Sequence, residues 1–156
     1  MTVAEKLVEL LKARRLKCAT AESCTGGGVG SAITAVSGSS AVYLGGVVSY
    51  ANEVKHGVLG VSEDTLATVG AVSSETAAQM AEGVRRLVGA DLAVSVTGIA
   101  GPDGGSVDKP VGLVWFGLAS AAGTRTEKAI FAGDRARVRE QAVVHALGML
   151  TTGAMA

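Results

Sequence analysis

Apolar residues recur at helical spacing in three stretches of the chain, one near each end and one in the middle. Each stretch follows a residue that is typical of a helix start. Thr2, with Glu5 three residues later, resembles a capping box. Ser73 or Ser74 precedes the middle stretch, and Asp134 precedes the last. The predicted apolar faces are Val3, Leu7, Leu10 and Leu11; Ala77, Met80, Ala81, Val84, Leu87 and Val88; and Val138, Ala142, Val143, Ala146, Leu147 and Leu150.

Five shorter runs have the composition of strands. The run 111–120 is apolar on both faces, as in a strand covered on both sides, and 124–131 is expected to pair with it as a hairpin. Two consecutive glycines interrupt the run 42–50, which indicates a β-bulge. The predicted strands are 17–22, 42–50, 91–97, 111–120 and 124–131, and shorter helices are expected at 26–36, with Thr25 as the cap, at 53–59 and at 62–68.

This order of helices and strands predicts an α/β fold in one domain spanning residues 1–156. The expected architecture is a three-layer α/β/α sandwich with a mixed β-sheet. Aromatic residues make up only 3% of the chain, so the core is expected to consist of Val, Leu, Ile and Ala. The 22 glycines cluster in a few places, which indicates turns and close backbone approaches.

The charge balance narrows the choice of partners. Fourteen basic residues match fourteen acidic ones, without a basic stripe, so nucleic acid is not an expected ligand. The longest apolar stretch, 111–122, is too short to span a bilayer, and the charged, amphipathic beginning is unlike a signal peptide. The spacing of the Cys and His residues favours neither a disulfide nor a metal site. We therefore expect a cytoplasmic protein that binds a small molecule and no membrane.

The stretch AESCTGGG (21–28) joins a predicted strand to a predicted helix. Such a turn exposes Ser23 or Cys24 beside free backbone N–H groups, where an anion or oxyanion is stabilised. The structural alternative is a capped helix whose glycines allow close packing on the sheet. Both residues are candidate nucleophiles, because a cysteine at a helix N-terminus is activated by a lowered pKa and a serine by a base.

A second polar stretch, SYANEVK (49–55), lies where a predicted strand gives way to a helix. Tyr50 and Lys55 are both able to reach the end of a neighbouring strand, and a desolvated lysine is a base for serine. The alternative is a solvated lysine on a short helix and a tyrosine at a sheet edge. His56 is a competing base if a carboxylate orients its imidazole ring.

The glycine-rich stretch TGIAGPDGG (97–105) begins where a strand ends, and KPVG (109–112) follows it. Ligands bind on this side of α/β sheets, and glycines let the backbone approach a ligand closely. The alternative is an ordinary surface loop, although loops of this length are uncommon in compact domains. The region is therefore predicted to contribute to a binding site.

The last motif is GDR (133–135), where Asp134 is expected to cap a helix. Arg135 in the first helical turn is unfavourably placed for the helix dipole. A cation in that position is typical of a residue that binds a carboxylate or phosphate. Arg137 and Arg139 are equivalent to Arg135 by sequence alone.

These motifs, in this order and spacing, resemble the C-terminal domain of the competence/damage-inducible CinA family, which includes stand-alone nicotinamide-nucleotide amidases. The resemblance covers nearly the whole chain, and we expect a stand-alone member without an N-terminal nucleotide-hydrolase domain. Gly28 departs from the pattern, since relatives often carry a larger residue there. The matching stretches are AESCTGG (21–27), YANEVK (50–55), GAVSSETAAQMAEGVR (70–85), TGIAGPDGG (97–105), KPVG (109–112) and GDR (133–135).

The resemblance implies hydrolysis of the carboxamide of nicotinamide mononucleotide to nicotinic acid mononucleotide and ammonia, a step of pyridine-nucleotide salvage, with no metal or organic cofactor. It favours Ser23 over Cys24 as the nucleophile, with Lys55 and Tyr50 as the activating groups. It gives His56 no role. The expected substrate-binding residues are Thr25, Gly26, Gly27, Thr97, Gly98, Gly101 and Arg135.

Two other classes of function remain consistent with the residues. A non-catalytic nucleotide-binding or regulatory module would use the same glycine loops to bind phosphate. A structural partner in competence or DNA-damage response is suggested by the family name, although the neutral charge argues against direct DNA contact. For the assembly we expect a homodimer or another homo-oligomer, formed by the apolar elements around 42–48 and the last helix.

Overall fold

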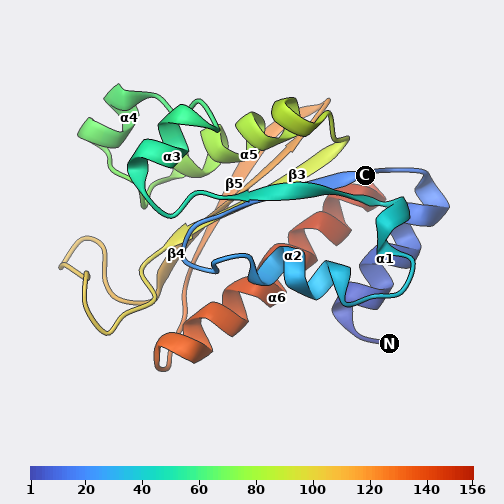
Figure 1. Cartoon of the computed structure of the whole chain (residues 1–156). Helices are drawn as coiled ribbons and strands as arrows, with labels where there is room; N and C mark the ends of the chain where they lie inside the picture. The colour runs from blue at the N-terminus through green and yellow to red at the C-terminus, as the bar shows by residue number, and fades with distance from the viewer.

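The computed structural model describes all 156 residues and contains one five-stranded sheet (Figure 1). The strands lie in the order β2 (Tyr43–Val48), β1 (Cys18–Glu22), β3 (Leu92–Gly98), β4 (Leu113–Ser120) and β5 (Gly123–Ile130). β1 is parallel to both β2 and β3, whereas β4 is antiparallel to β3 and to β5. The sheet is therefore mixed, as predicted.

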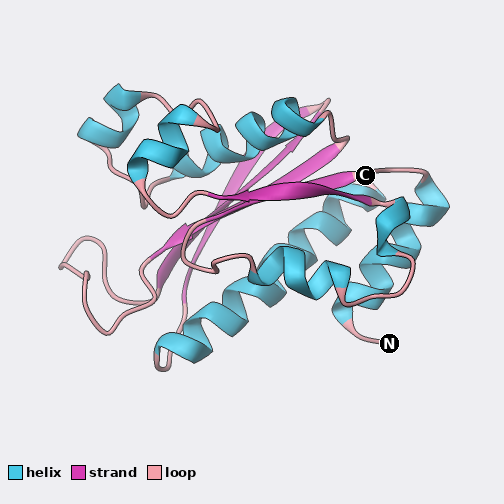
Figure 2. Cartoon of the chain, viewed as in Figure 1, coloured by secondary structure: helices cyan, strands magenta, loops and turns pink.

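Helices cover both faces of this sheet, which confirms the predicted three-layer sandwich (Figure 2). One face carries α1 (Val3–Arg14), α2 (Gly28–Thr34) and α6 (Arg135–Met155). The other carries α3 (Asn52–Gly57), α4 (Glu63–Thr68) and α5 (Ser74–Val88), of which α5 packs directly on the strands. A single 3-10 turn, η1 (Ser39–Ala41), precedes β2. No helix combines the length and the apolar character that crossing a bilayer requires.

The predicted caps of the long helices are confirmed. The Thr2 hydroxyl accepts a hydrogen bond from the Glu5 amide, and the Asp134 carboxylate accepts one from the Arg137 amide at 2.9 Å. Ser73, rather than Ser74, is the N-cap of α5. Each of these side chains satisfies an N–H group that the first helical turn leaves without a partner, which typically stabilises a helix by about 1 kcal/mol.

The prediction that Thr25 caps the second helix is wrong. The residue at the N-cap of α2 is Gly27, in the left-handed region at φ 104°, and the helix begins only at Gly28. The Thr25 hydroxyl instead donates to the buried Glu22 carboxylate at 2.6 Å. The acceptor that the prediction placed at Thr25 is therefore the carboxylate of Glu22, two residues upstream of the turn.

The predicted bulge in β2 is confirmed as a shift of register between β1 and β2. Cys18 lies opposite Tyr43, but the next residue, Ala19, lies opposite Gly45. One residue of β2 is therefore unpaired, and Gly45 has a φ of 145° that other residues rarely adopt. β2 ends at Val48, so Tyr50 belongs to the connection that leads into α3.

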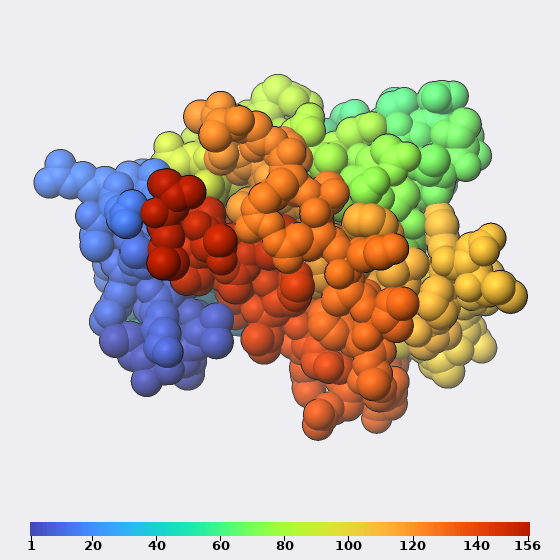
Figure 3. Space-filling view, turned by 180° about the vertical axis from the view of Figure 1, so that it is seen from behind, coloured from blue at the N-terminus to red at the C-terminus, as the bar shows by residue number.

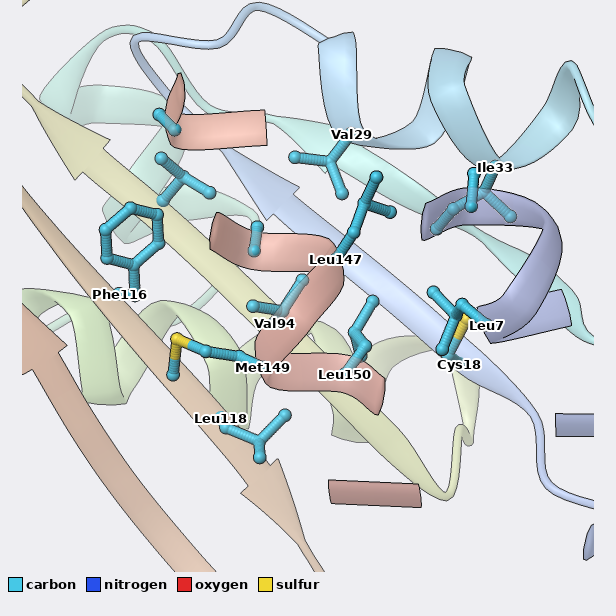
Figure 4. Close-up of a cluster of buried hydrophobic side chains, with 14 of the residues drawn as sticks. Leu7, Cys18, Val29, Ile33, Val94, Phe116, Leu118, Leu147, Met149 and Leu150 are labelled. Carbon is cyan, nitrogen blue, oxygen red and sulfur yellow. The ribbon is translucent and has the colours of Figure 1, made fainter. Parts of the chain in front are cut away.

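The larger hydrophobic cluster lies between the sheet and the α1–α2–α6 layer (Figure 4). Its side chains are mainly aliphatic, as the composition predicted, with Phe116 as the largest apolar one. A fully buried Leu, Ile or Phe typically contributes about 1.5–3 kcal/mol. A smaller cluster under α5 includes Ala19, Met80 and Val84. There the backbones of α5 and β4 lie so close that a Cβ atom at Gly117 would overlap the Ala77 carbonyl.

Candidate active site

Ser23 is the first residue after β1 and lies at the carboxyl end of the parallel strands. Its amide donates to the Val96 carbonyl of β3 at 2.9 Å, and its side chain is 7% exposed. The chain runs from β1 outward to β2 and then returns to β3 on the other side of β1, so β1 and β3 flank a topological switch point. In α/β sheets this crevice is the usual ligand site.

The Glu22 carboxylate fixes the turn that follows Ser23. It is 2% exposed and accepts hydrogen bonds from the Thr25 hydroxyl and from the amides of Val29 at 2.8 Å and Gly30 at 3.0 Å. A carboxylate is favoured there, because the unpaired N–H groups of a first helical turn point towards it. We had not predicted this role for Glu22. The only signal in the sequence was an acidic residue just before a predicted helix.

Lys55 of α3 is the largest fully buried side chain in the molecule, 1% exposed. Its Nζ lies 3.1 Å from Ser23 Oγ, 2.8 Å from the Ser49 carbonyl and 3.0 Å from the Tyr50 carbonyl. An ammonium group would donate to all three oxygens. A neutral amine has only two N–H bonds, and the carbonyls can only accept. With both carbonyls satisfied, its lone pair therefore faces the Ser23 hydroxyl.

Burial lowers the pKa of Lys55, against a smaller opposing effect of Cys24. No carboxylate forms an ion pair with this lysine. The neutral form is therefore more accessible than for an exposed lysine, which is the property that a base for serine needs.

Tyr50, predicted as the other activating group, meets Lys55 through its backbone. Its carbonyl orients Nζ, while its side chain is 65% exposed at the cavity described below. His56 does not reach Ser23, because its Nδ1 lies 2.8 Å from the Val61 carbonyl and its Nε2 lies 3.3 Å from Glu63. The structure therefore brings Lys55, and not His56, to the serine.

Cys24 lies beside the nucleophile candidate but is 5% exposed. Burial raises the pKa of the Cys24 thiol to about 11, although its own backbone and the cations of Arg139 and Lys55 act in the opposite direction. A thiol with this pKa is almost entirely protonated near neutral pH, and the thiolate is the reactive form. The environment thus favours Ser23 over Cys24.

A small cavity of about 210 Å³ opens above Ser23 and Lys55. Its walls come from four connections that lie far apart in the sequence, those after β1, β2, α4 and β3, together with residues of α3, β3 and α6. Some of the expected substrate-binding residues line this cavity, namely Thr97, Gly98 and Arg135. The others, Thr25, Gly26, Gly27 and Gly101, do not. The full lining is Ser23, Cys24, Tyr50, Asn52, Lys55, Ala71, Val72, Thr97, Gly98, Ala100 and Arg135.

The predicted residues outside the cavity wall support it. Gly26 and Gly27 have φ values of 60° and 104°, which the tight turn after Ser23 requires. The Gly101 carbonyl accepts a hydrogen bond from Arg135 Nη1 at 2.8 Å. The lining residue Thr97 is itself buried, and its hydroxyl donates to the Ala71 carbonyl at 2.9 Å.

The three arginines at the start of α6, equivalent by sequence, differ in the structure. Arg135 lines the cavity. Arg139 Nε donates to the Cys24 carbonyl at 3.0 Å and its Nη2 to the Thr25 carbonyl at 3.3 Å, so Arg139 braces the turn beside Ser23. Arg137 is exposed. The amides of Cys24, Thr25 and Gly27 in this turn have no protein acceptor. No cluster of three or more His, Cys, Asp or Glu residues is arranged to hold a metal ion.

A serine held against a buried lysine, with free amides beside it, is an arrangement typical of Ser–Lys hydrolases. Comparison with known sequences specifies the family. Residues 1–153 match the CinA C-terminal domain, and the chain belongs to that family.

Known relatives differ in how much of their length this chain covers. The nicotinamide-nucleotide amidohydrolase PncC of Escherichia coli K12 is 50% identical over 151 residues, which are 96% of this chain and 92% of that protein. A competence-damage inducible protein of Thermoanaerobacter sp. X514 is also 50% identical, but the chain spans only 35% of its length. Among solved structures, a CinA superfamily protein of Klebsiella pneumoniae superposes with a TM-score of 0.94 at 37% identity, covering 98% of this chain and 96% of that one.

Proposed function

We propose that this protein hydrolyses the carboxamide of nicotinamide mononucleotide to nicotinic acid mononucleotide and ammonia. The observation that carries the proposal is the 3.1 Å contact between Ser23 Oγ and the buried Lys55 amine. The near full-length similarity to the E. coli amidohydrolase supports the choice of substrate. The alternative of a non-catalytic nucleotide-binding module gives no reason to bury a lysine without a carboxylate partner against a serine.

In the proposed reaction, neutral Lys55 takes the proton of Ser23 while Oγ attacks the amide carbon. The carbonyl π bond opens to an oxyanion, which the free amides of the Cys24–Gly27 turn stabilise. Loss of one such donor typically lowers the rate by about 10²–10³. The Lys55 ammonium then protonates the leaving nitrogen, and the C–N bond breaks to give ammonia and an acyl ester on Ser23.

A water molecule completes the cycle. Lys55, neutral again, takes a proton from water as its oxygen attacks the ester carbon, and the returning proton restores the Ser23 hydroxyl as the acid leaves. Tyr50 acts in both halves as an activating group, through the carbonyl that orients the amine. Arg135 is the residue that we assign to the phosphate, because it is the cation at the cavity besides Lys55.

The test is release of ammonia from the purified protein with nicotinamide mononucleotide, nicotinamide riboside and free nicotinamide. We expect the mononucleotide to be preferred, because only it carries a phosphate for Arg135. Ser23→Ala is the matched control for contaminating activity. Binding of the mononucleotide without ammonia release would contradict the proposal and favour the non-catalytic module.

A further inference from the structure

The KPVG stretch contains Lys109, a motif cation with no place in the reaction described above. It is partly buried and lies on the loop between β3 and β4, outside the cavity above Ser23. Its Nζ donates to the Val69 carbonyl at 2.5 Å. That contact joins segments forty residues apart in sequence. In the space-filling view the loop around 100–110 is gold, and it lies against the green part of the chain, to which the segment around Val69 belongs (Figure 3).

Residues 69–73, which we call the wall segment, connect α4 to α5. Ala71 and Val72 line the cavity above Ser23, and Val72 also lines a second cavity of about 500 Å³ that includes Lys109. The wall segment is thus the partition between the two cavities. Its position decides how much room the substrate has on that side.

Backbone hydrogen bonds hold only the ends of the wall segment, where the Val69 and Gly70 amides donate to the Thr65 carbonyl and the Ser73 carbonyl accepts from Ala77, so its middle depends on side-chain donors. No backbone–backbone hydrogen bond involves Ala71 or Val72. The three carbonyls before Val72 each accept from a side chain: Val69 from Lys109, Gly70 from the hydroxyls of Ser73 and Thr76, and Ala71 from Thr97. Of these donors only Lys109 carries a charge, and charge-assisted hydrogen bonds are roughly twice as strong as neutral ones.

Lys109 also joins the two walls of the cavity to each other. The loop that carries it begins at the end of β3, where Gly98 and Ala100 line the site. Within this loop the Lys109 amide donates to Ser106 Oγ and its carbonyl accepts from the Ser106 amide at 2.8 Å, so its backbone is fixed. The backbone of Lys109 is thus held in the loop while its ammonium group is bonded to the Val69 carbonyl. The length of this side chain therefore sets the distance between the loop and the wall segment.

We propose that Lys109 is a positioning residue for the substrate cavity. It does not contact the reacting atoms, but it holds Ala71 and Val72 where they meet the substrate. The inference rests on the proposed function for its kinetic consequence. Its structural part, the immobilisation of the wall segment, does not depend on any substrate.

The experiment compares Lys109→Met and Lys109→Arg with Lys128→Met. Lys128 is a matched control, because it lines the same second cavity but extends over the Trp115 ring, 5.5 Å from its centroid, and has no bond to the wall segment. Backbone ¹⁵N relaxation gives the order parameters of Ala71 and Val72. We expect values of about 0.85 in the wild type, Lys109→Arg and Lys128→Met, and below about 0.6 in Lys109→Met.

Ammonia-release kinetics give the second readout. A loosened wall weakens binding of substrate and transition state alike, so in Lys109→Met the KM is expected to rise about tenfold while kcat stays within about threefold. Lys109→Arg should restore most of the difference. An unchanged KM and a rigid wall segment in Lys109→Met would overturn the proposal, as would equal effects of Lys109→Met and Lys128→Met. If the wild type releases no ammonia, the proposed function fails, while the relaxation data still decide the role of Lys109.

Discussion

Replacement of Lys55 by methionine tests the central contact of the site. Methionine keeps most of the apolar stem but has no amine, so Ser23 Oγ and the carbonyls of Ser49 and Tyr50 lose their shared partner. Lys55→Arg is the complementary change. Arginine keeps the charge and the donors but stays protonated at any accessible pH, so it cannot take the serine proton.

The expected loss follows from the geometry. Nζ is 3.1 Å from Ser23 Oγ, within direct reach for proton transfer. A positioned general base typically contributes about 10²–10⁴ in rate. This corresponds to about 2.7–5.5 kcal/mol of activation free energy. We therefore expect kcat to fall by this factor in both Lys55→Met and Lys55→Arg.

The assay is ammonia release as a function of pH. Because the pKa of Lys55 is lowered by burial, the wild-type kcat/KM should rise with pH through an apparent pKa below 10.5, the ordinary value for lysine. Circular dichroism spectra establish that the variants are folded. If Lys55→Met kept more than about a tenth of the wild-type kcat, a lysine base would be ruled out.

Stability provides a check that needs no substrate. A lysine with a lowered pKa in the folded state binds fewer protons there than in the unfolded chain. The contribution of Lys55 to the free energy of unfolding should therefore rise with pH between the lowered pKa and 10.5, and should not depend on pH below the lowered pKa, where both states are protonated. Urea unfolding of Lys55→Met should lack this component, so an identical pH dependence in both proteins would contradict the burial argument.

Four further variants probe Ser23 and the residues around it. Ser23→Ala should lower kcat by about 10⁴ or more, whereas Cys24→Ala should retain turnover in the ammonia assay, and the reverse pattern would make cysteine the nucleophile. Arg135→Met should raise the KM for the mononucleotide about tenfold and leave the riboside unaffected; equal effects on both would remove Arg135 from the phosphate site. Glu22→Gln turns an amide group towards the Gly30 amide, so urea titration should show unfolding easier by about 1–3 kcal/mol, and an unchanged midpoint would exclude the capping role.

The sequence predicted the architecture well because its signals were local. Helical spacing, the caps at Thr2, Ser73 and Asp134, and the glycine pair of β2 each depend on neighbours a few residues away. The wrong prediction at Thr25 also came from a local signal. A serine or threonine before a helix is normally its cap, but Glu22 approaches from the end of β1 with a stronger acceptor.

The candidate site was less accessible to prediction, since its contacts join distant parts of the chain. Lys55 was a candidate base only by residue type, and its burial becomes visible only in the fold, where its side chain lies against Ser23. Nothing in the order of residues distinguishes Arg135, which lines the cavity, from Arg139, which braces the turn. Motif resemblance indicated these residues as a set, but the geometry separates those that line the cavity from those that support it.

The order of the strands also has a consequence for how this protein matures. Ser23 follows β1, Lys55 follows β2, and Gly98 ends β3, so the cavity needs both crossover connections in place. Such long-range pairings are the slow steps of folding, because loop closure must precede the contacts that stabilise it. In a refolding experiment helix content should therefore return before ammonia release. The proposed ammonia release would thus serve as a probe of the completed sheet.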